Sequence, residues 1–149
     1  MQRLLKSLKK NEVNKISNSG KISVCATPIG NLDDCSKRLI SVFNDCDCVY
    51  CEDTRITRNL LSSLGIKKPL FRLDDNVIDA KTDEVIKKVE EGQRVVYCSD
   101  AGTPGVSDPG LKLVSAAHES KIKVEVIPGA CAAITAYVAS GFCNPKFAF

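Results

Sequence analysis

The chain has 149 residues and a net charge of +3 at neutral pH, with 44% hydrophobic and 26% charged residues, a balance near the average for soluble proteins. It contains no apolar run close to the roughly 20 residues that a membrane-spanning helix needs, so we expect no membrane partner. A chain of this length can bury about 70% of the surface that its unfolded state exposes. Its core should therefore need neither metal ions nor disulfides.

A basic segment opens the chain. Residues 1–20 hold five lysine and arginine residues against Glu12 alone, a local charge of +4 that leaves −1 for the remainder. We expect a solvated leader here, with contact to RNA or another partner as the alternative. The segment lacks the continuous apolar stretch and the cleavage site of a secretory signal, which predicts a cytoplasmic protein.

Eight cysteines are spread along the chain. In a domain of ordinary size without a signal peptide, they are expected to be reduced thiols. Cys48 and Cys51 form a C-x-x-C pattern of the kind found in redox modules and zinc sites. They fall in an expected strand, where side chains three positions apart point to opposite faces, so we expect no metal site. The one histidine, His118, is expected at a helix end or on the surface.

Short β-branched runs alternate with helical stretches from residue 21 onward. Strands are expected at residues 21–26, 46–51, 69–73, 94–98 and 123–127. Helices are expected at residues 33–44, 54–64, 79–91, 111–120 and 130–140. Asp33 or Asp34 would cap the first helix, and the alanines of the last helix permit close packing against the sheet or a ligand. Five such units predict an α/β fold, a doubly wound, mostly parallel five-stranded sheet with helices on both faces.

The predicted domain covers residues 21–149. At its end, Phe147-Ala148-Phe149 is typical of the start of a further strand, so we expect the domain to be one part of a longer protein.

Three turns of similar chemistry follow the first, fourth and fifth strands. They are Thr27–Leu32, Ser99–Gly110 and Pro128–Cys131. The longest holds three glycines and two prolines, which let backbone approach a ligand closely while limiting the shapes of the turn. Taken alone, it is more typical of an ordinary Gly/Pro connection than of a ligand-binding loop. Because ligands bind at the carboxyl ends of parallel strands, the three turns together predict one crevice.

The turns do not suit a nucleotide phosphate. Neither G-x-G-x-x-G nor G-x-x-x-x-G-K-[ST] follows any of the strands. Asp100 and Asp108 can instead accept hydrogen bonds from hydroxyls or an ammonium. The predicted ligand carries hydroxyls, an ammonium, a carboxylate and a planar base, but no phosphate.

Four motifs in the same order resemble those of the tetrapyrrole methylase superfamily, and within it the branch of ribosomal small-subunit methyltransferases. They are Thr27–Leu32, Glu52–Arg55, Ser99–Gly110, and Pro128-Gly129 followed by Ala132-Ala133. The resemblance implies an S-adenosyl-L-methionine-dependent enzyme that methylates the ribose 2′-hydroxyl of a cytidine in small-subunit ribosomal RNA. It also implies a two-domain homodimer, of which this chain is the N-terminal domain with the C-terminal domain absent. Residues 72–77 depart from the family pattern, which is richer there in histidine and glutamate.

The resemblance implies one set of site residues, those that bind the cofactor: Pro28, Asp100, Ala101, Gly102, Thr103, Ala130, Cys131 and Ala132. A second set follows from the chemistry of the residues at the end of the second expected strand, beside the predicted crevice. There, Glu52 or Asp53 is the expected general base and Arg55 the expected phosphate contact. The alternative is structural: Glu52, Asp53 and Thr54 would cap the following helix while Arg55 pairs with a carboxylate.

Other functions stay open from the residues alone. A small-molecule tetrapyrrole methyltransferase is one alternative, because the chain shows no basic stripe and few aromatics for base stacking. A redox module using Cys48 and Cys51 is a second. A catalytically silent cofactor-binding or dimerisation fragment is a third.

Overall fold

Five parallel strands form one sheet in the computed structural model, which describes residues 20–143, 146 and 148. The strands are β1 (Lys21–Cys25), β2 (Cys48–Cys51), β3 (Leu70–Arg72), β4 (Arg94–Cys98) and β5 (Lys123–Ile127). Their order across the sheet is β3-β2-β4-β1-β5, and every neighbouring pair is parallel. The predicted five-stranded sheet is confirmed. The leader expected at residues 1–20 lies outside the described residues except for Gly20, as does the strand expected at 147–149 except for Ala148.

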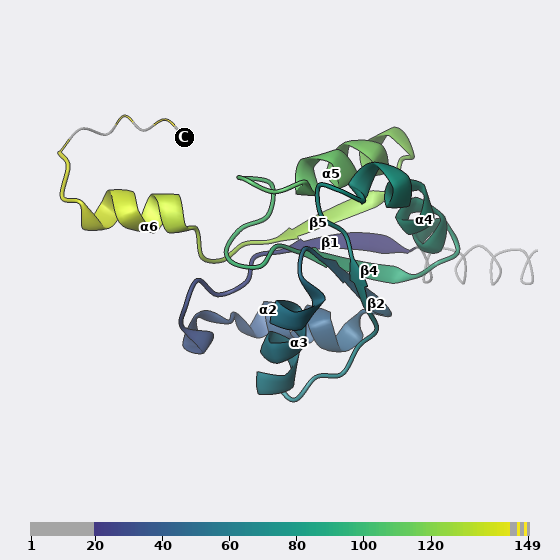
Figure 1. The fold of residues 1–149 in the computed structure, drawn as a ribbon, viewed down its shortest axis with the longest axis horizontal. Coiled ribbons are helices and arrows are strands. Elements are labelled where there is room, and N and C mark those ends of the chain that lie inside the picture. Colours follow the sequence, from purple (N-terminus) through teal and green to yellow (C-terminus); the bar gives the residue numbers. More distant parts are fainter. Residues whose placement is uncertain (1–19, 144–145, 147, 149) are drawn as a thin grey trace, which may run out of the picture.

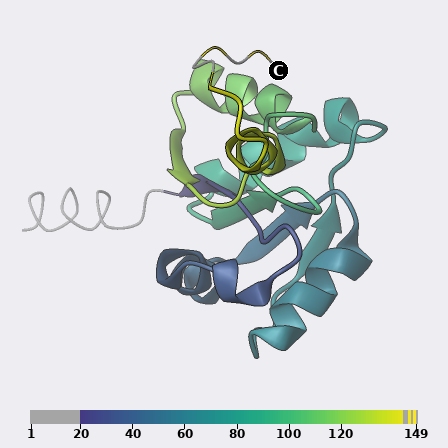
Figure 2. The ribbon, with the colours of Figure 1, turned by 90° about the vertical axis from the view of Figure 1, so that its left-hand side faces the viewer.

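Helices cover both faces of the sheet (Figures 1 and 2). On one face, α4 (Ile78–Glu90) and α5 (Gly110–Glu119) pack over Ile22, Tyr50 and Tyr97. On the other, α2 (Lys37–Asp45) and α3 (Thr54–Ser63) pack over strand residues such as Val49 and Val96. Successive strand residues thus enter different cores, as the two-residue period of a strand requires. The doubly wound arrangement with helices on both faces is confirmed.

The start of the first helix differs from the prediction. Leu32–Asp34 forms a single 3-10 turn capped by Asn31, and α2 begins only at Lys37. The Ser36 side chain accepts a hydrogen bond from the Leu39 N–H at 3.0 Å and is the helix cap. The prediction of Asp33 or Asp34 as the cap of this helix was wrong, because Ser36 meets the same requirement at the point where the regular helix starts.

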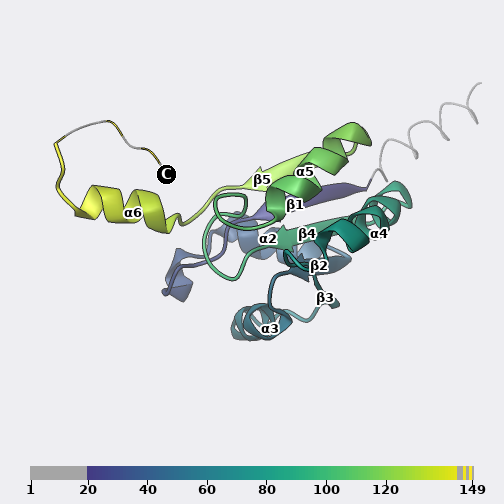
Figure 3. The same cartoon turned by 45° about the horizontal axis from the view of Figure 1, so that its top comes forward.

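The last helix, α6 (Ala132–Ala139), does not pack against the sheet. None of its residues is buried, and it extends away from both helical layers (Figures 1 and 3). Of the two expected alternatives, the sheet or a ligand, packing against the sheet was therefore wrong. The side chains of this helix are small or apolar on every side. Its sequence therefore has no polar face to indicate which side packs. Only the first turn, at Ala132 and Ala133, contacts the candidate site described below.

All eight cysteines are free, which confirms the expected reduced thiols. Cys48 enters the core beneath α4 and α5, whereas Cys51 enters the core beneath α2 and α3. The two thiols therefore diverge as predicted. Within the described residues, no group of three or more histidine, cysteine or acidic side chains is arranged to hold a metal ion, and no helix is long and apolar enough to cross a membrane. His118 is exposed in the last turn of α5, as expected.

Thiol titration should separate two classes of cysteine. Burial raises the pKa of Cys25 to about 12 and that of Cys46 to about 11, and the fully buried Cys98 is shifted in the same direction. Because the thiolate is the reactive form, we expect the five buried thiols to react with a disulfide reagent only after unfolding. Cys143 should react first in the native protein. Rapid native reaction of Cys48 and Cys51 together would contradict this and favour the redox alternative.

Glu125 joins three elements at one edge of the sheet. From β5, its carboxylate accepts hydrogen bonds from Lys21 Nζ of β1 and from Arg38 Nη2 of α2, each at 2.6 Å. Chiefly through the bond from Lys21, and then that from Arg38, the pKa of Glu125 is lowered to about 2. The pair of cations thus stabilises β5, which pairs with β1 alone among the strands of the described residues.

Replacing Glu125→Gln should lower the free energy of unfolding by about 1 kcal/mol at pH 7. The pKa of Glu125 is lower in the folded protein than in the unfolded chain. Its charge therefore stabilises the fold at pH values above the unfolded pKa, and this stabilisation is lost as the pH falls toward the folded pKa. The difference in free energy of unfolding between the variant and the original chain should shrink between about pH 5 and pH 2. Urea unfolding at several pH values measures it, with the exposed Glu90→Gln as control. A difference independent of pH would contradict the ion-pair account.

Candidate functional site

Direct hydrogen bonds tie the three glycine-containing turns together at the carboxyl edge of the sheet. Thr27, after β1, pairs with Gly102, after β4, through N–H···O bonds of 2.9 and 3.1 Å. The Thr103 hydroxyl donates to the Ala130 carbonyl, after β5, at 2.8 Å. Because β4, β1 and β5 are neighbours in the sheet, these turns meet at one place. The predicted convergence is confirmed.

The site lies where connections leave the sheet in opposite directions. The segment after β4 leads to α5 on one face, whereas those after β1 and β2 lead to α2 and α3 on the other. Such divergence opens a crevice at the strand ends and is the usual ligand position in doubly wound folds.

Glycine is required at the centre of this junction. Gly102 has φ +82°, and a Cβ there would lie 3.3 Å from Ile29 Cγ2 and 3.4 Å from the Ala130 carbonyl oxygen. Gly129 is constrained by space alone, since a Cβ there would lie 2.9 Å from Ala26 Cβ. Absence of a side chain at both positions therefore allows the three turns to approach one another.

A second junction links the ends of β2 and β4. Glu52 Oε1 accepts the Asp100 N–H at 3.0 Å, and Asp100 Oδ1 in turn accepts the Asp53 N–H at 2.9 Å. Each acidic side chain thus holds the backbone of the opposite loop. This reciprocal arrangement fixes the position of two carboxylates beside the crevice.

Asp108 organises the long loop that contains it. Its carboxylate accepts the N–H groups of Gly105 and Gly110, at 2.7 and 2.9 Å, and the Tyr97 hydroxyl at 3.3 Å. Burial, and next the Asp108 charge, raise the pKa of Tyr97, so its hydroxyl stays protonated and donates. Asp108 was expected to accept hydrogen bonds from a ligand. In the structure it accepts hydrogen bonds from three donors of the protein, and it also lines the hollow described next.

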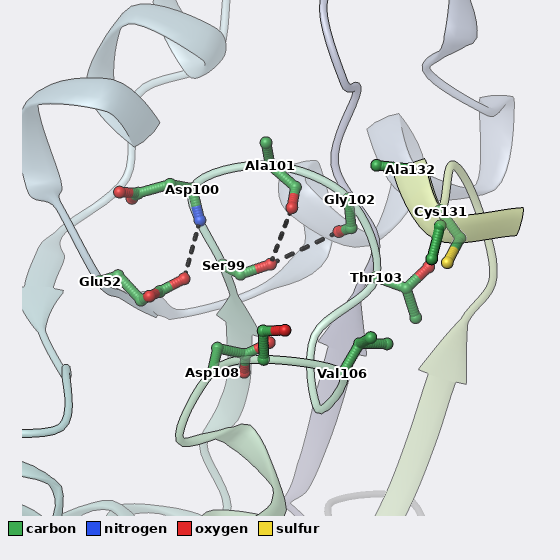
Figure 4. A pocket seen from close by; sticks show the side chains of 12 residues that line it. Glu52, Ser99, Asp100, Ala101, Gly102, Thr103, Val106, Asp108, Cys131 and Ala132 are labelled. Atoms are coloured by element: carbon green, nitrogen blue, oxygen red, sulfur yellow. Dashed lines mark hydrogen bonds between the residues drawn. The ribbon is translucent and has the colours of Figure 1, made fainter. Parts of the chain in front are cut away.

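These loops enclose a hollow of about 310 Å³, at the lower end of the range for small-molecule sites. Figure 4 shows Asp100 and Ala101 on one side and Val106 and Asp108 on the other. The hollow is lined by Glu52, Ser99, Asp100, Ala101, Gly102, Thr103, Val106, Ser107, Asp108, Cys131, Ala132 and Ala133. Three of these residues are acidic and none is basic. The lining therefore favours a ligand with positive charge and hydroxyl donors over a phosphate.

Six of the eight expected cofactor residues line this hollow: Asp100, Ala101, Gly102, Thr103, Cys131 and Ala132. Pro28 and Ala130 do not. Pro28 lies half-buried in the turn after β1, and Ala130 contributes its carbonyl to Thr103. The sequence analysis did not single out Val106, which also lines the hollow and is 42% exposed. The available signal was an apolar residue within a loop rich in glycine and proline.

A second hollow, of about 470 Å³, adjoins the first. Glu52 and Asp100 line both, and Asp53, Thr54, Arg55, Arg72 and Asp74 complete the second. Asp53 Oδ1 accepts the Arg55 N–H at 2.8 Å and caps α3, and Arg55 Nη2 bonds Asp53 Oδ2 at 2.6 Å. The structural roles considered as the alternative are thus the ones observed for these two residues.

The two acidic candidates differ in their affinity for a proton. Hydrogen bonds from the Arg55 side chain, and then from its N–H, lower the pKa of Asp53 to about 2, which makes it a weak base. Desolvation raises the pKa of Glu52, opposed by the Asp100 N–H and reinforced by neighbouring carboxylates. Glu52 is therefore the stronger base of the two, and it faces both hollows.

Replacing Gly102→Ala should destabilise the protein more than Gly65→Ala. Both glycines have positive φ, +82° and +71°, but a Cβ at Gly65 would meet no atom within 4 Å. Each alanine costs about 1 kcal/mol for the backbone conformation, and the tight contacts at Gly102 should add about 1 kcal/mol. Denaturant unfolding of both variants measures the difference. Equal decreases in the free energy of unfolding would show that the loops around Gly102 accommodate a Cβ without further destabilisation.

Comparisons with known proteins place these features in context. The family model for Tetrapyrrole (Corrin/Porphyrin) Methylases matches residues 21–146. Over 131 residues the chain is 46% identical to the ribosomal RNA small subunit methyltransferase I of Pasteurella multocida (strain Pm70), covering 88% of this chain and 47% of that protein. The corresponding Haemophilus influenzae protein (strain ATCC 51907 / DSM 11121 / KW20 / Rd) is 45% identical, with coverages of 88% and 46%. The chain therefore spans about half the length of these curated relatives.

Solved structures show the same architecture. A crystal structure of diphthine synthase superposes with a TM-score of 0.70 at 19% identity, covering 87% of this chain and 52% of the other. For uroporphyrin-III-C-methyltransferase from Thermus thermophilus, the TM-score is 0.64 at 25% identity, with coverages of 82% and 52%. These similarities concern the fold.

Proposed function

This chain belongs to the tetrapyrrole methylase family, and we propose that it is the methyl-donor-binding part of an S-adenosyl-L-methionine-dependent methyltransferase. The proposed acceptor is the ribose 2′-hydroxyl of a cytidine in small-subunit ribosomal RNA. Relatives at 45–46% identity carry the name ribosomal RNA small subunit methyltransferase I, which supports RNA over a tetrapyrrole as acceptor. We propose a cytoplasmic homodimer as the working form.

The observation that carries the proposal is the charge of the hollow. S-adenosyl-L-methionine, when bound, supplies an electrophilic methyl group on a sulfonium. Acidic side chains with no basic one among the lining residues suit that positive charge, the amino group and the ribose hydroxyls. Asp100 to Thr103 would hold the donor from one side, and Cys131 and Ala132 from the other.

Positioning accounts for most of the expected catalysis. Methyl transfer is an in-line displacement, so holding both reactants in line and excluding water can contribute up to about 7–11 kcal/mol. The cross-linked turns provide the rigidity for this alignment, because Thr27, Gly102, Thr103 and Ala130 are joined by hydrogen bonds rather than by packing alone.

Glu52 is the proposed general base. A ribose hydroxyl is a poor nucleophile while protonated, and a carboxylate that removes its proton contributes typically 10²–10⁴-fold. Glu52 lies between the two hollows, so it can face the donor in one and the acceptor in the other. Arg55 is proposed to bind a phosphate of the RNA, exchanging part of its contact with Asp53.

Donor binding can be tested by calorimetry with S-adenosyl-L-methionine and its demethylated product. We expect sub-millimolar binding to the chain. Cys131→Leu places a larger side chain in the lining and should weaken binding at least tenfold, whereas Cys143→Leu, outside the hollow, should not. Equal affinity of the two variants would contradict the assigned site.

The role of Glu52 can be isolated because its Oε1 also supports the loop. Glu52→Gln keeps an acceptor for the Asp100 N–H and leaves Asp100 and Asp108 in the lining, so donor affinity should fall much less than turnover. Transfer of labelled methyl groups to 30S subunits should fall 10²–10⁴-fold. Transfer by the original chain should decrease as the pH falls through the raised pKa of Glu52, because the protonated acid cannot act as a base.

Two results would count against this role. Unchanged turnover in Glu52→Gln would remove Glu52 from the mechanism. Donor binding without any transfer by the original chain would favour the silent cofactor-binding fragment.

A further inference from the structure

A basic groove lies alongside α3, distinct from the acidic hollow. It has a volume of about 290 Å³, and its lining includes Arg58, Lys67 and Lys68 with no carboxylate. Its floor is apolar, formed in part by the buried Leu61 and Ile66. The groove therefore combines positive charge at the rim with an apolar base.

Arg58 is unusual among the arginines of residues 20–143. Each of the other four forms an ion pair: Arg38 with Glu125, Arg55 with Asp53, Arg72 with Asp74 and Arg94 with Asp47. Arg58 has no ion pair within the described residues, and it is exposed. Its guanidinium is therefore available for an anion from outside the chain.

The neighbouring lysines add to this charge. Lys67 is exposed and also lacks an ion pair among the described residues. Lys68 donates to the carbonyls of Asn44 and Cys46, each at 2.7 Å, which holds its ammonium at the groove without neutralising it. Three cations are thus presented together, and none of them forms an ion pair among the described residues.

Helix α3 leads from the second hollow to the groove. Arg55, in the first turn of α3, lines that hollow, and Arg58, one turn later, lines the groove. Residues three apart share a helix face. A strand with its reactive nucleotide near Glu52 could therefore extend past Arg55 to Arg58, presenting successive phosphates to the two guanidinium groups.

We propose that the groove of Arg58, Lys67 and Lys68 binds the backbone of the RNA strand that flanks the methylated nucleotide. This inference rests on the proposed function, and it assigns the RNA contact to α3 and the segment before β3. Acidic lining serves the methyl donor, and the basic groove serves the polyanionic acceptor. The two ligands are thereby directed to different surfaces by charge.

The test is fluorescence anisotropy of a labelled single-stranded RNA at several salt concentrations. The variant Arg58→Gln/Lys67→Gln removes two of these three charges without touching the acidic hollow. Each lost phosphate contact lowers the slope of log affinity against log salt by about 0.7 for a single strand, so we expect a slope reduced by about 1.4. Affinity at low salt should fall about tenfold or more. The matched control is Lys87→Gln/Lys121→Gln, which removes two exposed lysines elsewhere.

Calorimetry with S-adenosyl-L-methionine separates this inference from the proposed function. Donor affinity should be the same in the original chain and both double variants. RNA binding that is equal in all three proteins would overturn the groove, and so would the absence of salt-dependent RNA binding by the original chain. In either case, the calorimetric measurement of S-adenosyl-L-methionine binding still tests the proposed function separately. Loss of binding to 30S subunits with unchanged binding to free RNA would assign the groove to an acidic ribosomal protein and overturn it as well.

Discussion

The candidate site depends on the paired backbone hydrogen bonds between Thr27 and Gly102. A parallel sheet brings strand ends to one edge, but it does not by itself join the loops that follow them. This bridge, with the Thr103 to Ala130 hydrogen bond, converts three separate connections into one wall. It also explains the glycine at position 102, where the φ of +82° and the approach of Ile29 both disfavour a side chain.

Acidic side chains have two different roles around this wall. Asp108 holds its own loop through Gly105 and Gly110. Glu52 accepts the Asp100 N–H, and Asp100 in turn accepts the Asp53 N–H. Such carboxylates are pre-oriented by the fold rather than by a ligand. A site of this kind has a fixed negative potential before anything binds, which selects for positively charged ligands. The basic groove lies further along α3 and before β3, and its lining has the opposite charge.

Much of the fold could be predicted from sequence periodicity. The strands at 94–98 and 123–127 have the expected bounds, because β-branched and apolar residues stand between clear turn residues. The first helix began later than expected, since Ser36 competes with two aspartates for the same capping role. The packing of α6 could not be predicted, because a helix apolar on all sides carries no period that identifies a buried face.

The sequence by itself determined the elements, the turns and the chemistry available at each strand end, because these follow from local side-chain type and spacing. Tertiary structure decided which of those groups meet. Glu52 and Asp100 are 48 residues apart and bond only because β2 and β4 are neighbours. The same contacts separated Glu52, whose pKa is raised by desolvation, from Asp53, whose pKa is lowered by Arg55. Adjacent acids thus differ in pKa because burial and hydrogen-bond partners are properties of the folded chain.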